Sequence, residues 1–420
     1  MRIGIDISTV LNHGRDVGAG RYITNLVKSL FELDLDDEFI LTGRYITDEY
    51  LWLAEELKQH YLGIKERTSK PVSGDSNPLA DNNSEDNSSK STHTAGRLSF
   101  NLIKTTQKKL DLSNRMGFPP MEFYGFKADV FHCPDFLIAP TLNNRVILTI
   151  HDLAFIRFPQ FNFEWFVKKY TKEVTKNARV AKRIIAVSYS TKNDIVELLK
   201  INPEKVDVAH EAADEVFRKL IESEKKYSLQ KKYNISKKFI LSVGTIEPRK
   251  NYVTLLKAFN RLKYEKPQSY DSDLQLVIVG RTGWMSEATT AEYNQSPFKD
   301  DIILTGRLSD AELLQMYNMA ELFVYPSIFE GFGLPIVEAM QCGLPVIASN
   351  SSSIPEIVDD KKLLFNPADE GDILDKINMV LGNERLKVEL SEKVLKNAAK
   401  FSWKNTAQKT LEVYRQIFKA

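Results

Sequence analysis

The sequence lacks most features that mark secreted, membrane-spanning or nucleic-acid-binding proteins. Of its 420 residues only two are cysteines, Cys133 and Cys342, and they do not form a CxxC pair. No run of about 18 apolar residues is present, so we expect no membrane-spanning helix. The 57 basic and 56 acidic side chains leave a net charge of +1, without the basic excess of a nucleic-acid-binding protein. We therefore expect two reduced core cysteines and no nucleic-acid partner.

Ligands for a metal ion are also few. The six histidines are scattered along the chain without zinc-like spacing. Two Asp-x-Asp triplets, Asp34–Asp36 and Asp271–Asp273, lie in polar stretches beyond helical patterns rather than at the ends of strands. Because 56 acidic residues produce such triplets by chance, we expect neither a catalytic metal nor a cofactor.

What the chain does have is a regular alternation of short apolar runs with helical patterns. The first run, in MRIGIDIST, is typical of a buried strand and lacks the long apolar core of a signal peptide, so we expect a cytoplasmic protein. One series of runs is Arg2–Ile7, Glu38–Thr42, Ala128–Cys133, Arg145–Ile150, Arg183–Ser188 and Lys205–His210. A second series is Lys238–Gly244, Leu274–Gly280, Ile302–Gly306, Leu322–Ser327 and Pro345–Ser349.

Strands that alternate with helices indicate βαβ units and parallel sheets. We predict an α/β protein of two Rossmann-like, doubly wound domains, residues 1–212 and 213–400, joined within 212–236. Residues 401–420 form an amphipathic helix that can pack on either domain. Residues 68–96 are rich in Ser, Asn, Asp, Lys and Gly and contain no aromatic residue. Because such a segment buries little apolar surface, we predict a disordered insertion there.

Three strand-to-helix turns have the composition of phosphate-binding loops. The first, Asp16–Arg21, precedes a helix predicted over Tyr22–Phe31. Its glycines, Gly18 and Gly20, allow the backbone to approach a phosphate closely at the helix N-terminus. Ile23 stands where a GxGxxG fingerprint has its third glycine, which disfavours a dinucleotide. A plain tight turn is the alternative interpretation.

The second turn, Gly244–Asn251, places two cations directly before a helix. Arg249 and Lys250 precede the predicted helix Tyr252–Leu262, with Asn251 as its N-cap. Two cations at a helix N-terminus oppose the helix dipole unless an anion lies between them. The pattern favours an anion site, and a solvated pair of charges is the alternative.

The third turn, Phe329–Pro335, contains two glycines and precedes a predicted helix over Ile336–Gln341. A proline suits the first turn of a helix, and glycines let backbone amides point toward a ligand. Glu330 lies in this turn, and Glu338 follows eight residues later on the helix.

The segment Glu330-Gly-Phe-Gly-Leu-Pro-Ile-Val-Glu338 resembles the Glu-x7-Glu motif of the retaining GT-B glycosyltransferases of family 4, which include bacterial mannosyltransferases. The following Ala-Met-Gln-Cys-Gly-Leu-Pro-Val-Ile-Ala is also similar to that family. So are Gly244–Asn251, the Gly18-Ala-Gly20-Arg loop, the pair His151-Asp152 and the tail Phe401-Ser-Trp403. The resemblance covers nearly the whole chain apart from residues 68–96.

The resemblance implies a GT-B fold, in which two Rossmann-like domains face a cleft and the C-terminal helix crosses back to the first domain. The first domain would take the acceptor and the second the nucleotide-sugar donor. Arg249 and Lys250 would hold the donor diphosphate, and Glu338 would bond the ribose hydroxyls. Many relatives carry an arginine where this chain has Thr245, so we expect Arg249 to supply that charge.

The remaining roles follow from the same resemblance. Glu330 and the amides of the loop would hold the transferred sugar, and the loop with Gly18 and Gly20 would lie near the diphosphate. The implied catalytic residues are His151, Asp152, Arg249, Lys250 and Glu330. The implied donor-binding residues are Gly18, Gly20, Arg249, Lys250, Glu330, Gly331, Phe332, Gly333, Leu334 and Glu338.

The implied reaction is metal-independent transfer of a hexose, with mannose and GDP-mannose favoured, to a glycan or lipid-linked acceptor in polysaccharide or cell-envelope synthesis. Attack on the front face of the sugar would retain its configuration. Two alternatives remain: another GT-B enzyme, such as a nucleotide-sugar epimerase or a phosphorylase, and a non-catalytic nucleotide-sugar-binding module.

Two further features bear on the acceptor. Within a helix predicted over residues 165–183, basic residues recur three and four apart, at Lys169, Lys172, Lys176, Arg179 and Arg183. They form either a solvated face or a contact with anionic lipid headgroups, which would place the protein peripherally on the cytoplasmic face of a membrane. His132 is either a buried, hydrogen-bonded histidine or a contact to the acceptor.

Overall fold

The chain packs into two compact units. The first combines Met1–Thr149, Val180–Arg183 and Ala407–Ala420, and the second combines Ile150–Arg179 and Ile184–Thr406. These units do not coincide with the predicted domains, whose limits at residues 212 and 400 stay a prediction. The computed structural model describes residues 1–15, 18–33, 36–69, 98–225, 227–235, 238–265 and 273–419.

Within the described residues the first sheet has seven strands in the order β3-β2-β1-β4-β5-β6-β7. The strands from β3 to β5 in this order pair in parallel, and so do β6 and β7. The strands are β1 (Arg2–Asp6), β2 (Glu38–Tyr45), β3 (Leu98–Lys104), β4 (Val130–Cys133), β5 (Val146–Ile150), β6 (Arg183–Ala186) and β7 (Val206–Val208). The helices that connect them are α1 (Ser8–His13), α2 (Gly18–Glu32), α3 (Leu51–Ser69), α4 (Gln107–Met116), α5 (Ala154–Arg157), α6 (Glu164–Val180) and α7 (Tyr189–Leu199).

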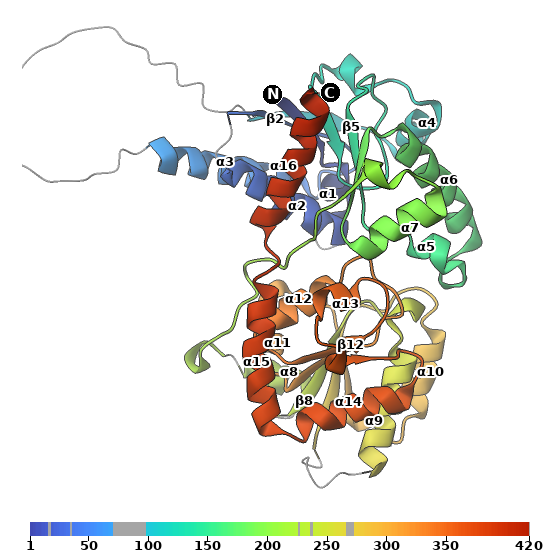
Figure 1. Cartoon of the computed structure of the whole chain (residues 1–420), viewed down its shortest axis with the longest axis vertical. Helices are drawn as coiled ribbons and strands as arrows, with labels where there is room; N and C mark the ends of the chain where they lie inside the picture. The colour runs from blue at the N-terminus through green and yellow to red at the C-terminus, as the bar shows by residue number, and fades with distance from the viewer. Residues whose placement is uncertain are drawn as a thin grey trace, which may run out of the picture. The chain divides into compact units, whose positions relative to one another are not determined.

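The second sheet has six strands in the described part of the chain, in the order β10-β9-β8-β11-β12-β13. The strands are β8 (Phe239–Val243), β9 (Gln275–Val279), β10 (Ile302–Gly306), β11 (Leu322–Tyr325), β12 (Val346–Ser349) and β13 (Leu364–Phe365). The remaining α-helices of the described chain are α8 (Ser228–Tyr233), α9 (Tyr252–Glu265), α10 (Glu287–Gln295), α11 (Asp310–Met319), α12 (Leu334–Gln341), α13 (Ile354–Ile357), α14 (Glu370–Leu381), α15 (Glu384–Ala398) and α16 (Trp403–Lys419). Around this sheet α9 packs against α14, and α12 against α15 (Figure 1).

Each apolar run predicted to be a strand is a strand in the structure, with ends that differ by a few residues. Central strands such as β5 and β8 are buried along their whole length, because helices cover both faces of a parallel sheet. Two strands were missed. β3 is a half-buried edge strand beside the polar insertion, and β13 has only two residues. Of the predicted insertion 68–96, residues 68 and 69 end α3, and the rest lies outside the described residues.

A buried hydrogen-bond chain joins the C-terminal helix to the core of the first unit. His132 on β4 contacts the Tyr414 hydroxyl through Nδ1 at 2.7 Å and the Thr149 hydroxyl through Nε2 at 2.8 Å. All three residues are fully buried. The structure thus confirms the buried, hydrogen-bonded interpretation of His132, and it places the later part of α16, red in Figure 1, in the first unit.

Both cysteines are buried and free, as predicted. Burial raises the pKa of each thiol, which keeps Cys133 and Cys342 protonated near neutral pH.

In the amphipathic C-terminal segment, Trp403, Leu411, Val413, Tyr414 and Ile417 are buried, whereas Phe418 is 43% exposed and faces Arg145.

The basic helix ends earlier than predicted. Helix α6 stops at Val180, so Arg183 belongs to β6 and not to the helical stripe. The four cations Lys169, Lys172, Lys176 and Arg179 are exposed, and Val174 and Ala178 are buried on the other face. The solvated stripe is therefore present, and its contact with lipid stays a prediction. Among the described residues, no helix is long and apolar enough to cross a membrane.

We expect Tyr414→Phe to destabilise the protein by about 1–2 kcal/mol, because the buried His132 ring loses one hydrogen-bond partner. Urea denaturation measures the change. Phe418→Leu, on the same helix but half exposed, serves as the control, with a change of less than about 0.5 kcal/mol. Equal stabilities for the two variants would contradict a role for this hydrogen bond.

Candidate active site

Two of the three predicted phosphate-binding turns, Gly244–Asn251 and Phe329–Pro335, meet at the carboxyl edge of the second sheet. Strands β8 and β11 are neighbours, but the chain continues from β8 toward β9 and from β11 toward β12, on opposite sides. In open α/β sheets, ligands bind in the crevice at such a switch point. The two loops that leave these strands carry Arg249 and Lys250 in one case and Glu330 in the other.

Hydrogen bonds hold the two loops together. Pro248–Lys250 forms a short 3-10 turn, and the Arg249 carbonyl accepts a bond from the Ile328 amide at 2.9 Å. Asn251 has a positive φ of 58°, and its side-chain amide donates to the carbonyls of Pro326 and Pro367. It precedes α9 as predicted, but its Oδ1 accepts from the hydroxyl of Thr254 rather than capping a backbone amide.

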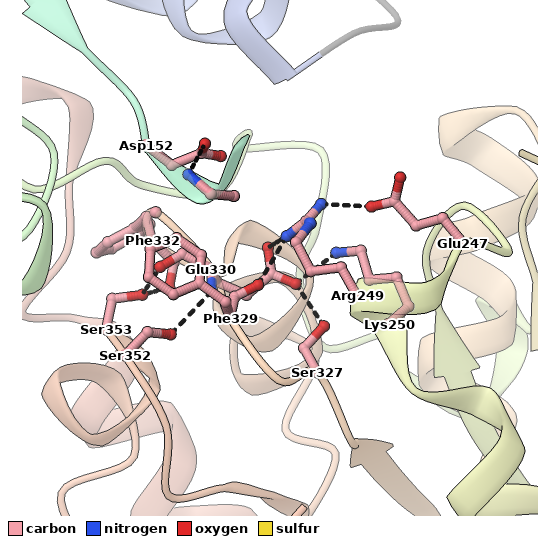
Figure 2. A network of polar contacts seen from close by, with 12 residues as sticks. Asp152, Glu247, Arg249, Lys250, Ser327, Phe329, Glu330, Phe332, Ser352 and Ser353 are labelled. Atoms are coloured by element: carbon pink, nitrogen blue, oxygen red, sulfur yellow. Dashed lines mark hydrogen bonds and ion pairs between the residues drawn. The ribbon is translucent and has the colours of Figure 1, made fainter. Parts of the chain in front are cut away.

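The Glu330 carboxylate lies at the centre of the joined loops (Figure 2). Its Oε2 accepts a bond from Arg249 Nη1 at 2.7 Å, and its Oε1 accepts from Lys250 Nζ at 2.6 Å. The hydroxyls of Tyr325 and Ser327 also donate to Oε1. Lys250 donates a further bond to the Tyr325 hydroxyl at 2.8 Å. Glu330 is therefore saturated by donors, two of them charged.

A second carboxylate completes the charge balance. Arg249 Nη2 donates to Glu247 Oε1 at 2.7 Å, and Glu247 is only 2% exposed. The two cations Arg249 and Lys250 thus face two anions, Glu247 and Glu330. The sequence pattern favoured an external anion between the two cations; in the structure the protein supplies two carboxylates beside them.

The ion pairs change the acidity of their members. Burial alone would raise the pKa of Glu330, but the charges of Arg249 and Lys250 outweigh it and lower that pKa to about 2. Burial lowers the pKa of Lys250, and the neighbouring Glu330 opposes that shift. Burial also lowers the pKa of Arg249, but Glu330 and Glu247 outweigh it and raise that pKa. At neutral pH Glu330 is therefore an anion, hydrogen-bonded by both cations.

Two serines hold the loop that follows Glu330. Ser352 Oγ accepts a bond from the Glu330 amide at 2.8 Å, and Ser353 Oγ donates to the carbonyls of Glu330 and Phe332. Gly333 has a φ of 128°, a conformation that favours glycine, and α12 begins at the next residue. Within the described residues, the amides of Gly331, Phe332, Gly333 and Leu334 donate no hydrogen bond, so they can serve a ligand.

His151 and Asp152 lie beside this loop within the second unit. A Cβ atom added to Gly331 would meet the His151 carbonyl oxygen at 2.0 Å, so only glycine fits there. The His151 ring contacts the buried Glu211 through Nδ1 at 2.9 Å. If Nδ1 carries the proton, Nε2 is the acceptor nitrogen of the ring. Asp152 Oδ1 accepts a hydrogen bond from the Ala154 amide. The Asp152 charge also raises the pKa of Arg249, by less than burial, Glu330 and Glu247 change it.

The other predicted donor residues are placed elsewhere. Glu338 on α12 is 5% exposed, and its Oε2 accepts from the Tyr317 hydroxyl at 2.9 Å. Gly18 and Gly20 belong to the first unit, at the start of α2. A Cβ on Gly20 would meet the Gly14 carbonyl oxygen at 2.0 Å. Asp16 and Val17 of that turn lie outside the described residues.

Several residues of the network were not predicted from the sequence. Glu247 lies in a recognised turn but was passed over in favour of the cations. Ser352 and Ser353 follow β12, the neighbour of β11, so a serine run after a predicted strand was the available signal. Glu211 directly follows His210 after β7 and gave no motif. In the described residues, no group of three or more His, Cys, Asp and Glu side chains could hold a metal ion.

Two family models match the chain. Residues 222–401 match the model for glycosyl transferases group 1, and residues 114–216 match the model for glycosyltransferase family 4. O-antigen chain mannosyltransferase B of Escherichia coli is 30% identical over 292 residues, which is 70% of this chain and 75% of the relative. The serotype-specific mannosyltransferase WbdA of the same species is 35% identical over 284 residues, 66% of this chain and 34% of the relative. The match thus spans about a third of the length of WbdA.

Solved structures show the same fold over the whole chain. Sucrose-phosphate synthase of Thermosynechococcus elongatus aligns with a TM-score of 0.69 at 17% identity, covering 100% of this chain and 99% of the other. HepE of Anabaena, solved in complex with UDP-glucose, aligns with a TM-score of 0.67 at 15% identity, covering 99% and 100%.

We expect Glu330→Gln to destabilise the protein by about 3 kcal/mol near neutral pH, because two buried cations lose their shared anion. The folded-state pKa of Glu330, about 2, lies below its ordinary value of 4.5. Its stabilisation is therefore complete above pH 4.5 and is lost as the pH falls toward 2. Urea denaturation at several pH values should show the difference between wild type and variant shrinking in that window.

Glu389→Gln, which removes an exposed carboxylate on α15, is the matched control and should change stability by less than about 0.5 kcal/mol. A difference between wild type and Glu330→Gln that stays constant from neutral to acid pH would rule out the ion pairs as its source.

Proposed function

The chain belongs to the group 1 glycosyltransferases and has the GT-B fold, as its motifs predicted. From this we propose that it transfers mannose from GDP-mannose to a glycan or lipid-linked acceptor. The acceptor belongs to polysaccharide or cell-envelope synthesis in this proposal. The mannosyltransferase relatives, one named for the O-antigen chain and one as serotype-specific, support mannose as the transferred sugar and an acceptor of this kind. The proposed reaction retains the configuration of the sugar and needs no metal ion.

The observation that carries the proposal is the spare hydrogen-bond donor capacity of Arg249. A guanidinium has five N–H donors, and Phe329, Glu330 and Glu247 use three of those of Arg249 in the described part of the chain. The Arg249 side chain is 20% exposed. Two N–H groups of Arg249 are thus left for a donor phosphate, while the ion pairs fix the guanidinium in place.

The clamp proposed for the donor diphosphate combines charge with backbone amides. Negative charge builds on the leaving phosphate as the bond between it and the anomeric carbon breaks. Arg249 and Lys250, already oriented by Glu330, stabilise that charge without reorganising at the moment of reaction. The amides from Gly331 to Leu334 bind oxygens of the transferred sugar. A single preorganised donor of this type contributes about 3–4 kcal/mol to lowering a barrier.

The proposed transfer takes place on one face of the sugar. The acceptor hydroxyl oxygen forms the new bond to the anomeric carbon while the phosphate oxygen departs on the same side and takes the hydroxyl proton. His151, oriented by Glu211, and Asp152 bind the transferred sugar beside Gly331. Glu338 bonds the ribose hydroxyls, and the loop of Gly18 and Gly20 lies near the diphosphate.

Incubation with GDP-mannose, UDP-glucose, UDP-galactose and ADP-glucose, with mass spectrometry of the products, tests the donor proposal. Hydrolysis or transfer restricted to GDP-mannose supports it. Turnover of a uridine or adenosine donor instead would replace the proposed base, and interconversion of nucleotide sugars without release of nucleotide would indicate an epimerase.

We expect Lys250→Ala to lower kcat/KM at least 100-fold and to weaken GDP binding, because a charge-assisted phosphate contact is lost. Lys263→Ala is the matched control, since Lys263 is also nearly buried and pairs with Asp301, in another part of the same unit. Steady-state kinetics and calorimetry compare the two. Near-normal turnover by Lys250→Ala would remove this residue from the mechanism.

Activity should be unchanged in excess EDTA, because the cationic side chains and amides take the place that a metal ion has in other glycosyltransferases. Initial rates of GDP release before and after chelation measure this. Loss of activity that Mg²⁺ or Mn²⁺ restores would contradict the proposal and direct attention to the Asp-x-Asp triplets.

A further inference from the structure

The first turn of α7 contacts two segments that the proposed function assigns to the transferred sugar. In that proposal the sugar is bound by His151 and by the backbone amides from Gly331 to Leu334. Thr191, the third residue of α7, is only 1% exposed and lies against both segments. Its hydroxyl donates to the carbonyl oxygen of His151 at 3.1 Å and to that of Gly331 at 3.1 Å.

These two hydrogen bonds depend on a single proton. A threonine hydroxyl has one O–H donor, so Thr191 shares its proton between the two carbonyls. The hydroxyl of Ser188 donates to Thr191 Oγ1 at 3.1 Å, which directs the Thr191 proton toward the carbonyls. Within the described residues, the carbonyl of the buried Gly331 accepts no other hydrogen bond. A buried carbonyl that loses its donor is destabilised, so the loop at Gly331 depends on this hydroxyl.

The two segments approach each other closely where the hydroxyl joins them. A Cβ atom on Gly331 would lie 2.0 Å from the His151 carbonyl oxygen and 2.9 Å from the Cβ of Asp152. The carbonyl oxygens of His151 and Gly331 both carry partial negative charge, so they repel each other unless they share a donor. Thr191 supplies that donor. Its hydroxyl therefore sets the spacing between His151 and the loop.

Glu356 fixes the turn that carries Thr191. Its Oε1 accepts a hydrogen bond from the Ser190 amide at 2.7 Å, and its Oε2 accepts one from the Tyr189 amide at 2.9 Å. The next amide, that of Thr191, donates to Ser188 Oγ at 3.0 Å. The amides at the start of a helix have no partner within the helix, and here side chains satisfy them. The helix dipole also favours a carboxylate at this end.

The segment that contains Glu356 also holds the sugar-binding loop. Glu356 lies on α13, three residues after Ser353. The Ser353 hydroxyl donates to the carbonyls of Glu330 and Phe332 (Figure 2). His210 Nε2 lies 3.1 Å from Glu356 Oε2, and the His210 ring packs against Phe332 with 5.8 Å between the ring centroids. The turn of α7 is thus joined to the loop through α13 as well as through the shared hydroxyl.

We propose that Thr191 is a positioning residue of the transfer reaction, which holds His151 and the amides from Gly331 to Leu334 at the spacing that the transferred sugar needs. It contacts neither the sugar nor the diphosphate and acts through the two carbonyls. This inference rests on the proposed function, because it concerns the sugar site of that reaction. A misplacement of about 1 Å can lower a rate about 100-fold, so the loss of this spacing is large enough to measure.

The test uses the full chain and two substitutions of one residue. Thr191→Val keeps the shape of the side chain and removes the hydroxyl, whereas Thr191→Ser keeps the hydroxyl and removes a methyl group. Thr42→Val is the matched control, because Thr42 is fully buried in the first unit and donates to the Asn101 carbonyl at 3.0 Å. Calorimetry gives the Kd of GDP and of GDP-mannose, and steady-state kinetics give kcat and KM. Hydrogen–deuterium exchange with mass spectrometry follows residues 328–336.

We expect Thr191→Val to lower kcat/KM at least 10-fold and to weaken GDP-mannose binding at least fivefold. The Kd of GDP should stay within twofold, because the sugar alone reaches the displaced groups. Residues 328–336 should exchange at least threefold faster. Thr191→Ser should stay within threefold of wild type in every measurement, and Thr42→Val within twofold. Rescue by serine and a selective effect on the sugar separate positioning from a general structural defect.

Wild-type kinetics of Thr191→Val would overturn the inference, and so would a Thr191→Ser variant as impaired as Thr191→Val. Equal weakening of GDP and GDP-mannose would also overturn it, in favour of a general defect. If the wild type turns over a different nucleotide sugar, the same comparison with that donor decides the inference, and only the proposed donor fails. If it turns over none, the proposed function fails. In that case faster exchange of residues 328–336 in Thr191→Val alone supports the linkage by Thr191, and unchanged exchange overturns it.

Discussion

The candidate site depends on one arrangement, in which the buried carboxylate of Glu330 is shared by two adjacent cations. Arg249 and Lys250 come from one loop and Glu330 from another, about 80 residues later in the chain. Without this anion, two neighbouring cations would be desolvated side by side, at a cost that binding energy from a donor would have to offset. With it, both side chains have a fixed direction before any ligand arrives.

This arrangement also separates two tasks that a phosphate-binding cation must combine. A buried cation is held rigidly but has lost its hydration, whereas an exposed one is mobile and screened. Arg249 is both held in place and able to bind a ligand. Three of its N–H groups bond Phe329, Glu330 and Glu247, and its other two N–H groups are not used by these residues. Lys250 is more deeply buried than Arg249, and in the proposed function it contributes charge rather than a directed hydrogen bond. The serines at 352 and 353 hold the loop after Glu330 in a similar way, through its backbone.

The same strand order appears in both sheets, with the first and fourth strands of each adjacent at the switch point. In each sheet the loops at that point carry a buried arginine or lysine beside carboxylates. The balance of charge differs. In the second sheet two cations face two carboxylates. In the first, one cation, Arg44, lies near two carboxylates, Asp6 and Asp135.

The sequence was sufficient for those parts of the fold that follow from local pattern. Buried strands such as β8 are continuous apolar runs bounded by glycine or charge, so their positions could be predicted. Edge strands could not: β3 is half buried, and its pairing with β2 depends on a neighbour distant in sequence. The site shows the same division. Arg249, Lys250 and Glu330 belong to recognisable sequence motifs. Glu247 and Glu211 belong to none that predicts their hydrogen bonds to Arg249 and His151, so these bonds could be seen only in the structure.

The composition of the first unit has a consequence for how the chain is made. Its strands β1 to β5 come from the first 150 residues, but one of the two hydroxyls bonded to His132 belongs to Tyr414. Ribosomes add about 5–20 residues per second, so the sheet waits on the order of tens of seconds for its last helix. Until then His132 lacks one of its two hydrogen-bond partners, and the residues that pack against the later part of α16 have no helix over them. The amino-terminal unit is therefore not complete until synthesis has passed residue 406, where the second unit ends.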